Sequence, residues 1–366
     1  MLSSDGSAEL LYGTTYGGGA PGPSPSPCSL GCGTVYAIDP NEPVSENVVH
    51  AFGGDGDGAI PEGDLTVVNT TTGDFLYGTT SYGGEKNASG CPHGCGTIFD
   101  IDPSGRESVL YSFAGSPGDG ATPVGALFMP VSGTFYGVTE YGGAHGFGTI
   151  FTWSASGGET PIYSFKGGLR DGAYPINNFI AVGGALYGIT SQGGKANAGT
   201  VFRLTLAPTA KERAIFSFTS TTGDYPAGLD AYSNSTTLYG TTSAGGRNQR
   251  GTVFALSVAG RMKWVYSFKG DPDGAFPRAQ PRLYQDAIYG TTHGGGKNGV
   301  GSIYRIEATG KGECILHSFG AGDDGFWPVA TLRRWTVAGT SRFYGTALAG
   351  GANGLGSVFA IPPTAC

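Results

Sequence analysis

The chain has 366 residues, of which 68 are glycine and 22 are proline, while 13% are charged and 12% are aromatic. The net charge is −7 and the Lys and Arg residues are scattered, which excludes the basic surface that nucleic-acid binding needs. No stretch of about 18 apolar residues is present, so no membrane-spanning helix is expected. The aromatic content indicates a packed core, and the glycines are therefore expected in the turns of a regular structure.

The first ten residues, MLSSDGSAEL, lack the charged and apolar regions of a secretory signal peptide. They lead directly into a repeated pattern, so we expect that any signal peptide was removed from this sequence. Residues 1–7 contain an Asp-Gly turn signal, and they are expected to supply the first strand.

One phrase recurs seven times along the chain. LYGTTYGGG at residues 11–19 returns, for example, as LYGTTSYGG at 76–84 and as FYGTALAGG at 343–351. The motif tyrosines are Tyr12, Tyr77, Tyr136, Tyr187, Tyr239, Tyr289 and Tyr344, at steps of 50 to 65 residues. A period of about 50 residues is typical of a β-propeller blade. We therefore predict a single domain, residues 1–366, made of seven repeats.

Each repeat contains four short runs of β-branched and aromatic residues, named strands a to d here in chain order. Strand a is expected at 64–70, 126–131, 178–182 and 282–286, and strand b contains the repeated phrase, as at 75–80. Strand c is expected at 33–38, 96–101, 199–204 and 356–361, and strand d at 48–52, 108–113, 214–218, 264–268 and 315–319. Seven such units predict an all-β fold, a seven-bladed β-propeller with four-stranded antiparallel blades.

Glycine is unusual inside a strand, because it has no side chain to pack. Its recurrence in YGTT predicts either a close approach of another sheet or a β-bulge at this position. The tyrosine before it is expected to fill the space between blades. The repeated phrase is therefore interpreted as structural.

One blade is expected to be short of a strand. Strands b and c occur seven times and strand d six times, and only PPTAC follows the last strand c. We expect N- and C-terminal strands to close the propeller together in one blade. Three explanations stay open: a three-stranded blade, a truncated sequence, or a strand supplied by a neighbouring chain in an oligomer or filament.

The six cysteines are placed in pairs. Cys28 and Cys32 enclose SLG, Cys91 and Cys95 enclose PHG, and Cys314 and Cys366 remain. The even count and the paired spacing favour disulfides and an oxidising compartment, and a Cys314–Cys366 bond is our hypothesis for the tail. A metal site built from the two C-x3-C pairs and reduced structural thiols are the alternatives.

The pattern L-Y-G-T-T-x-x-G-G, then G-T-V-F-x-I, then L-Y-S-F and D-G-A-x-P, resembles the Gloeobacter/Verrucomicrobia tandem repeat of large bacterial extracellular proteins. The resemblance covers nearly the whole chain. It implies a secreted or cell-surface, β-propeller-like array. It implies no established activity and supplies no catalytic residue.

The alternation of strand direction places the loops from strand b to c (b–c loops) and from strand d to the next strand a (d–a loops) on one face. The d–a loops carry an Asp series, namely Asp57, Asp119, Asp171, Asp224, Asp273 and Asp324. Recurrence favours a turn role, in which Asp caps its own backbone and the next Gly takes a positive φ. No cofactor is expected, and the alternative is a Ca²⁺ site at Asp55 and Asp57, although the EF-hand spacing is missing.

The same loop face carries the candidate ligand-binding residues. An aromatic residue precedes proline in four adjacent d–a loops, at Tyr174, Tyr225, Phe276 and Trp327. These rings either stack on a sugar or fill gaps between blades. His93, His145 and His293 lie in b–c loops, and they are further candidates for ligand or metal binding. No nucleophile, P-loop or metalloprotease motif is present, so the catalytic residues are unknown.

These observations predict an extracellular or cell-surface propeller that binds a glycan or protein ligand through its loop-rich face. A polysaccharide lyase or glycoside hydrolase on the same face is one alternative, although the sequence singles out no pair of carboxylates. A structural subunit of an extracellular filament, self-associating through the incomplete blade, is the other.

Overall fold

The structure is a computed structural model that describes residues 10–19, 28–40, 46–54, 56–85, 90–206, 210–320, 322–337, 339–363 and 366. It consists of two compact units. The first contains residues 1–166 and 174–178, and the second contains residues 167–173 and 179–366. The expected single domain over residues 1–366 stays a prediction.

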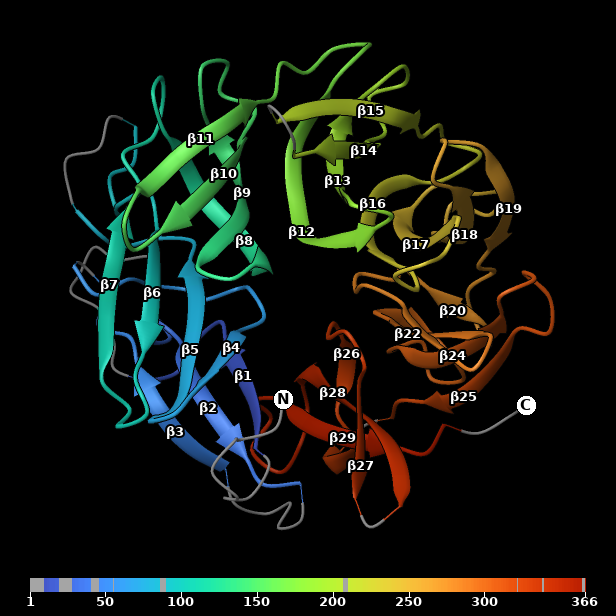
Figure 1. Cartoon of the computed structure of the whole chain (residues 1–366). Helices are drawn as coiled ribbons and strands as arrows, with labels where there is room; N and C mark the ends of the chain where they lie inside the picture. The colour runs from blue at the N-terminus through green and yellow to red at the C-terminus, as the bar shows by residue number, and fades with distance from the viewer. Residues whose placement is uncertain are drawn as a thin grey trace. The chain divides into compact units, whose positions relative to one another are not determined.

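Seven antiparallel sheets follow one another in chain order (Figure 1), and they confirm the predicted seven-bladed β-propeller. Each sheet is one blade. Blades 1 to 3 consist of β1 (Leu11–Thr15), β2 (Thr34–Ile38) and β3 (Glu46–Ala51); β4 (Thr66–Thr70), β5 (Gly73–Thr80), β6 (Thr97–Ile101) and β7 (Glu107–Ser112); and β8 (Gly120–Val131), β9 (Thr134–Gly142), β10 (Thr149–Ser154) and β11 (Gly158–Ser164). Blades 4 and 5 consist of β12 (Gly172–Val182), β13 (Ala185–Gly193), β14 (Thr200–Thr205) and β15 (Lys211–Ser217); and β16 (Asp224–Asp230), β17 (Thr237–Ala244), β18 (Thr252–Ser257) and β19 (Met262–Ser267).

Blades 6 and 7 have an interrupted strand a. Blade 6 consists of β21 (Arg282–Tyr284), β22 (Ala287–Thr292), β24 (Ser302–Glu307) and β25 (Cys314–Ser318), with a ribbon of β20 (Gly274–Ala275) and β23 (Gly294–Gly295) beside it. Blade 7 consists of β26 (Phe326–Pro328), β27 (Arg333–Val337), β28 (Thr340–Ala349) and β29 (Ser357–Ile361), after a 3₁₀ turn at Gly322–Asp324.

Two blades lack a strand within the described residues. Blade 1 has strands b, c and d, and its expected strand a in residues 1–7 lies outside the described part of the chain. In blade 7, β29 pairs with β28, and no described strand follows it, so a strand d is missing as predicted. No sheet of the described residues combines strands from both chain ends, and closure by such a mixed blade therefore stays a prediction.

The glycine of the repeated phrase lies under an aromatic ring of its own blade. In β5, Gly78 is paired across the sheet with Phe99 of β6, and a Cβ on Gly78 would lie 2.5 Å from that ring. The other pairs are Gly13–Tyr36, Gly137–Phe151, Gly188–Phe202, Gly240–Phe254, Gly290–Tyr304 and Gly345–Phe359. The predicted close approach is therefore present, but a ring on the adjacent strand makes it, because the flat ring needs the space of a missing Cβ.

The same ring also joins consecutive blades. The Phe that follows strand d packs edge-to-face on the strand c ring of the next blade, as Phe113 does on Phe151 at 5.1 Å and Phe319 on Phe359 at 5.0 Å. Such edge-to-face pairs are a favoured aromatic geometry. The motif tyrosine also faces the next blade, since Tyr77 packs against Phe135 at 4.6 Å. The hydrophobic core therefore lies between sheets, as expected for a propeller.

We predict that Gly137→Ala destabilises the protein, because the new Cβ would lie 2.2 Å from the Phe151 ring. Such overpacking in a tight core costs about 2 kcal/mol in free energy of unfolding. Denaturant unfolding followed by tryptophan fluorescence measures the change. The control is Gly118→Ala, because no atom lies within 4 Å of a Cβ there and its φ is not left-handed. Equal stability of the two variants would contradict the role of the ring.

Candidate functional site

Within each unit, b–c loops of one blade contact d–a loops of the next. Between blades 1 and 2, the backbone N–H of Ile60 donates to the carbonyl of Cys32 at 2.8 Å, and Ser81 donates to Ile60 at 3.0 Å. The d–a loop of blade 2 is thus held between the b–c loop of blade 1 and the strand b end of its own blade. The same bond recurs where Trp327 donates to Val300 at 2.8 Å.

The residue before each proline of the d–a loops has a left-handed backbone. The φ angles are 59° at Ile60, 56° at Thr122, 57° at Tyr174, 51° at Tyr225, 58° at Phe276 and 60° at Trp327. Non-glycine residues are uncommon in this region. The turn places the proline against the glycine that precedes strand c of the preceding blade, since a Cβ on Gly96 would lie 2.4 Å from Pro123.

The sequence prediction assigned the positive φ to the glycine after Asp, and this holds at Gly58 and Gly325. It is wrong at Gly120, Gly172 and Gly274, which have no positive φ. In these three loops the glycine N–H donates to the carboxylate of the Asp before it, at 2.6 to 2.7 Å. The Asp series does serve the turns, as predicted: the Asp119 carboxylate also accepts the N–H of Ala114 at 2.6 Å.

Two of the four candidate aromatic residues fill space. Tyr174 is half-buried and lies 5.3 Å from the ring of Tyr141. Phe276 is half-buried, and the guanidinium of Arg250 lies 5.3 Å from its ring centre. Tyr141 lies near the end of β9 and Arg250 lies in the b–c loop of blade 5, so both rings pack against neighbouring side chains. Their part in ligand binding stays a prediction.

The other two, Tyr225 and Trp327, expose 47% and 40% of their surface. The Trp327 ring is parallel to His293, with an angle of 5° and 5.6 Å between the ring centres. Burial and the charge of Arg278 lower the pKa of His293, which therefore favours its neutral form. Beside this pair is a hollow of about 330 Å³, lined by Asn298, Val300, Gly320, Phe326 and Trp327.

The remaining histidine candidates do not form a cluster. His145 is exposed and His93 is half-buried. Neither belongs to a group of three metal-binding side chains within the described residues. Their role in ligand binding stays a prediction.

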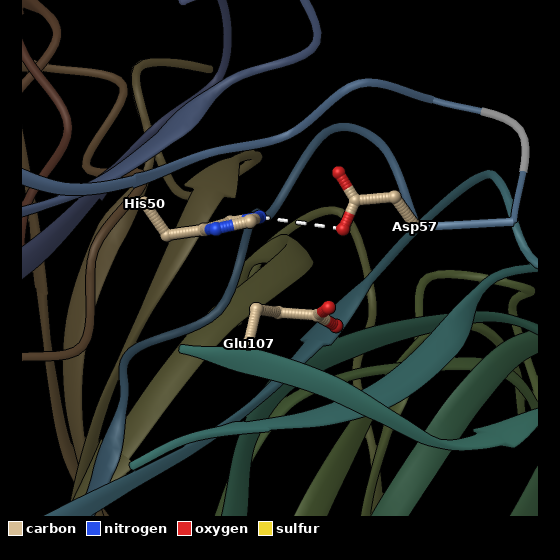
Figure 2. Close-up of side chains that lie close together, drawn as sticks. All are labelled: His50, Asp57 and Glu107. Carbon is tan, nitrogen blue, oxygen red and sulfur yellow. Dashed lines mark hydrogen bonds and ion pairs between the residues drawn. The ribbon is translucent and has the colours of Figure 1, made fainter. Parts of the chain in front are cut away.

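A different histidine lies among carboxylates. His50 on β3, Asp57 in the following d–a loop and Glu107 at the start of β7 point toward one another (Figure 2). Their ligand atoms all lie within 4.8 Å of one another, and His50 Nε2 is 3.3 Å from Asp57 Oδ1. This group joins blade 1 to blade 2. It includes Asp57 of the predicted Ca²⁺ site, whereas Asp55 lies outside the described residues.

The arrangement recurs at other blade boundaries with tyrosine in place of histidine. The Tyr111 hydroxyl donates to Asp119 at 2.9 Å, and Glu159 of the next blade is close enough to act on both groups. In the second unit, Tyr266 is hydrogen-bonded to Asp273 and Glu313, both at 2.9 Å. His317 and Asp324 repeat the pair at 3.0 Å, where blade 7 provides no described strand d to bring a glutamate.

Close carboxyl groups in these clusters favour the protonated glutamate. Burial and the charge of the neighbouring Asp raise the pKa of Glu107 and of Glu159 to about 8, and that of Glu313 to about 7. For Asp57, burial opposes ionisation, but hydrogen bonds from His50 and the N–H of Gly53 lower its pKa. Glu107 and Glu159 therefore favour their protonated form near neutral pH.

Glu107 was missed because the sequence analysis followed the Asp series alone. A glutamate also recurs at the start of strand d, at positions 46, 107, 159, 212 and 313. That recurrence was the available signal. Which Asp each of these glutamates lies beside depends on how neighbouring blades pack.

The six cysteines form three disulfides, Cys28–Cys32, Cys91–Cys95 and Cys314–Cys366. The hypothesis for the tail is confirmed, since Cys366 is joined to β25 of blade 6. The alternatives of a cysteine metal site and of reduced thiols are wrong, because no free cysteine remains.

Comparison with known proteins agrees with this architecture. The Gloeobacter/Verrucomicrobia repeat matches residues 2–199, 87–285 and 231–365. The chain therefore belongs to the Gloeobacter/Verrucomicrobia repeat family. No curated protein sequence matches it.

Several solved structures are similar in fold. A candidate 6-phosphogluconolactonase from Bacteroides fragilis NCTC 9343 has a TM-score of 0.55 at 14% identity, covering 98% of this chain and 96% of its own. Its counterpart from Bacteroides uniformis ATCC 8492 has a TM-score of 0.53 at 12% identity, covering 90% and 92%. A protein of unknown function from Desulfotomaculum acetoxidans DSM 771 has a TM-score of 0.52 at 11% identity, covering 90% and 96%. At these identities the likeness concerns the fold alone.

The raised pKa of Glu159 predicts that stability depends on pH. Folded Glu159 keeps its proton up to about pH 8, whereas the unfolded chain releases it near pH 4.5. Stability is therefore expected to fall as the pH rises between these values, by about 1 kcal/mol after allowance for partial exposure.

Glu159→Gln should remove this loss, being more stable than the parent protein at pH 8.5 and equal to it at pH 4. Thermal melts across this range measure the difference. Glu85→Gln, at an exposed carboxyl group, is the control. An unchanged pH profile in Glu159→Gln would refute the assignment.

Proposed function

We propose that this protein is a secreted or cell-surface binding module that takes a glycan on its loop face. Trp327 carries the proposal, because it is exposed, is parallel to His293 and borders the hollow. A flat, uncharged aromatic surface beside polar groups suits the apolar face and the hydroxyls of a sugar ring. The Cys28–Cys32, Cys91–Cys95 and Cys314–Cys366 disulfides support an oxidising, extracellular location. No described helix is long and apolar enough to span a membrane.

The enzyme alternative receives less support. The carboxyl groups that lie close together, Asp57 with Glu107, Asp119 with Glu159 and Asp273 with Glu313, repeat one arrangement between blades. A glycoside hydrolase needs one pair with two different environments. Three similar pairs favour a packing role instead.

We predict that Trp327→Ala weakens glycan binding at least tenfold, because stacking on the ring is lost. A glycan array identifies the ligand, and calorimetry on the best hit gives the affinity. Tyr232→Ala removes another exposed ring, in the loop between strands a and b, and should leave the affinity unchanged. Absence of any bound glycan, or an unchanged affinity in Trp327→Ala, would refute the proposal, and turnover of a bound polysaccharide would favour the enzyme.

A second candidate function is assembly through blade 7. In blades 1 to 6, strand c pairs with strand d, whereas no described strand pairs with the other edge of β29. The disulfide of Cys366 holds the tail that follows β29 on blade 6. Exposed strand edges are sites for the addition of a strand from another chain.

Blade 7 also keeps the groups that receive strand d elsewhere. In blade 6, the Gly301 carbonyl accepts the N–H of Phe319 at 3.0 Å, and the Asn298 side chain donates to the Phe319 carbonyl at 2.8 Å. The equivalent residues of blade 7 are Gly356 and Asn353. Neither makes such a bond with a described residue. We infer that β29 accepts an extended segment with the sequence pattern of strand d from a neighbouring chain.

The peptide GRESVLYSFAG, residues 105–115, tests this second function. It should bind the intact protein with a stoichiometry of one, measured by fluorescence anisotropy. The peptide carrying Phe113→Ala should bind at least tenfold more weakly, because it lacks the ring that follows every strand d. Asn353→Ala in the protein should also weaken binding. Equal binding of a scrambled peptide, or none at about 1 mM, would rule out this interaction.

A further inference from the structure

We propose that His50, Asp57 and Glu107 form a binding site for one divalent transition-metal ion, with zinc as the best match. The three side chains come from β3, a d–a loop and β7, and they converge on one point (Figure 2). The site lies between blades 1 and 2 and does not depend on the proposed glycan binding.

The geometry suits a small ion. Two ligands of a tetrahedral zinc, each about 2.0–2.1 Å from the metal, lie about 3.4 Å apart. His50 Nε2 and Asp57 Oδ1 are 3.3 Å apart, and the third ligand atom lies within 4.8 Å of both. Rotation of the Glu107 side chain would bring in the third protein ligand, and water would supply the fourth.

The ligands are oriented by the surrounding structure. The second Asp57 oxygen accepts the N–H of Gly53 at 2.6 Å, and the His50 ring packs edge-to-face on Phe52 at 4.8 Å. Glu107 Oε1 is buried without a hydrogen-bond partner among the described residues. The side chains of His50 and Asp57 are 20% and 28% exposed, so an ion can reach them from solvent. A buried carboxylate oxygen without a hydrogen-bond partner, beside ligands that other contacts already hold in place, favours the binding of a cation.

Ligand type separates zinc from calcium. Calcium prefers a shell of six to eight oxygens, whereas imidazole nitrogen with carboxylates suits zinc and its neighbours in the first transition series. The equivalent clusters at Tyr111 and Tyr266 offer a phenol in place of the imidazole. A protonated phenol is a poor metal ligand. Among the clusters described, the one between blades 1 and 2 therefore has the ligand types that suit a metal ion.

The sister clusters also supply a variant that should fold. His50→Tyr recreates the side chain that blades 2 and 5 carry at this position, at Tyr111 and Tyr266. Zinc chloride is titrated calorimetrically into the tag-free, chelator-treated full chain. We expect one zinc per chain with micromolar or tighter affinity, and a loss of at least tenfold in His50→Tyr. Glu107→Gln should lose affinity similarly, and it decides the question if His50→Tyr does not fold.

Two further variants sharpen the test. His317→Tyr changes the other His–Asp pair, which lacks a glutamate, and it should leave zinc binding unchanged. Tyr111→His gives blade 2 the donor set of blade 1, and it should raise the stoichiometry to two. Zinc binding unaffected by His50→Tyr, no binding below about 100 μM, or calcium binding more tightly than zinc would overturn the proposal.

Discussion

The structure depends on one recurring contact, an aromatic ring of strand c held between a glycine and a phenylalanine. The glycine belongs to strand b of the same blade, and the phenylalanine follows strand d of the preceding blade, as in Gly137, Phe151 and Phe113. Because the ring occupies the place of a Cβ, the glycine is not replaceable. The same ring also contacts the phenylalanine of the preceding blade. One side chain therefore contributes both to the packing within its own sheet and to the packing between two sheets. This double role explains why the YG phrase returns in every blade.

A second contact set fixes the loop face. The d–a loops make a left-handed turn before their proline, as at Ile60 and Trp327, and there they bond to the preceding b–c loop. Their Asp ties the backbone of its own loop, as Asp119 does. At several boundaries this Asp also meets a glutamate from the next strand d. Because these Asp and glutamate pairs recur at several blade boundaries, we interpret them as part of the packing between blades. Departures from the repeat are where specific functions are proposed, because packing does not require them: His50 in place of tyrosine, Trp327 beside His293, and the edge of β29 with which no described strand pairs.

The period of about 50 residues was enough to predict the blade count, and the patterns of strands b, c and d located most strands correctly. The disulfides followed from the paired spacing of the cysteines. Side-chain partners were harder to foresee. Glu107 lies 50 residues after Asp57 in the sequence, and nothing local in the sequence indicates that the two side chains lie together. The left-handed turns were also placed two residues too early in three loops, since the tie between Asp and glycine is a property of the folded loop.

By itself the sequence determined what repeats. Strand periodicity, turn residues and apolar content act locally, and each blade has to meet the same requirements. Only the tertiary structure decided how individual copies of the repeat differ: that His50 faces two carboxyl groups, that Trp327 stays exposed while Tyr174 is half-buried, and that β29 keeps an unpaired edge among the described residues. The physical reason is that these properties depend on neighbours from the next blade, about 50 residues away in the chain, which packing brings together and local sequence does not specify.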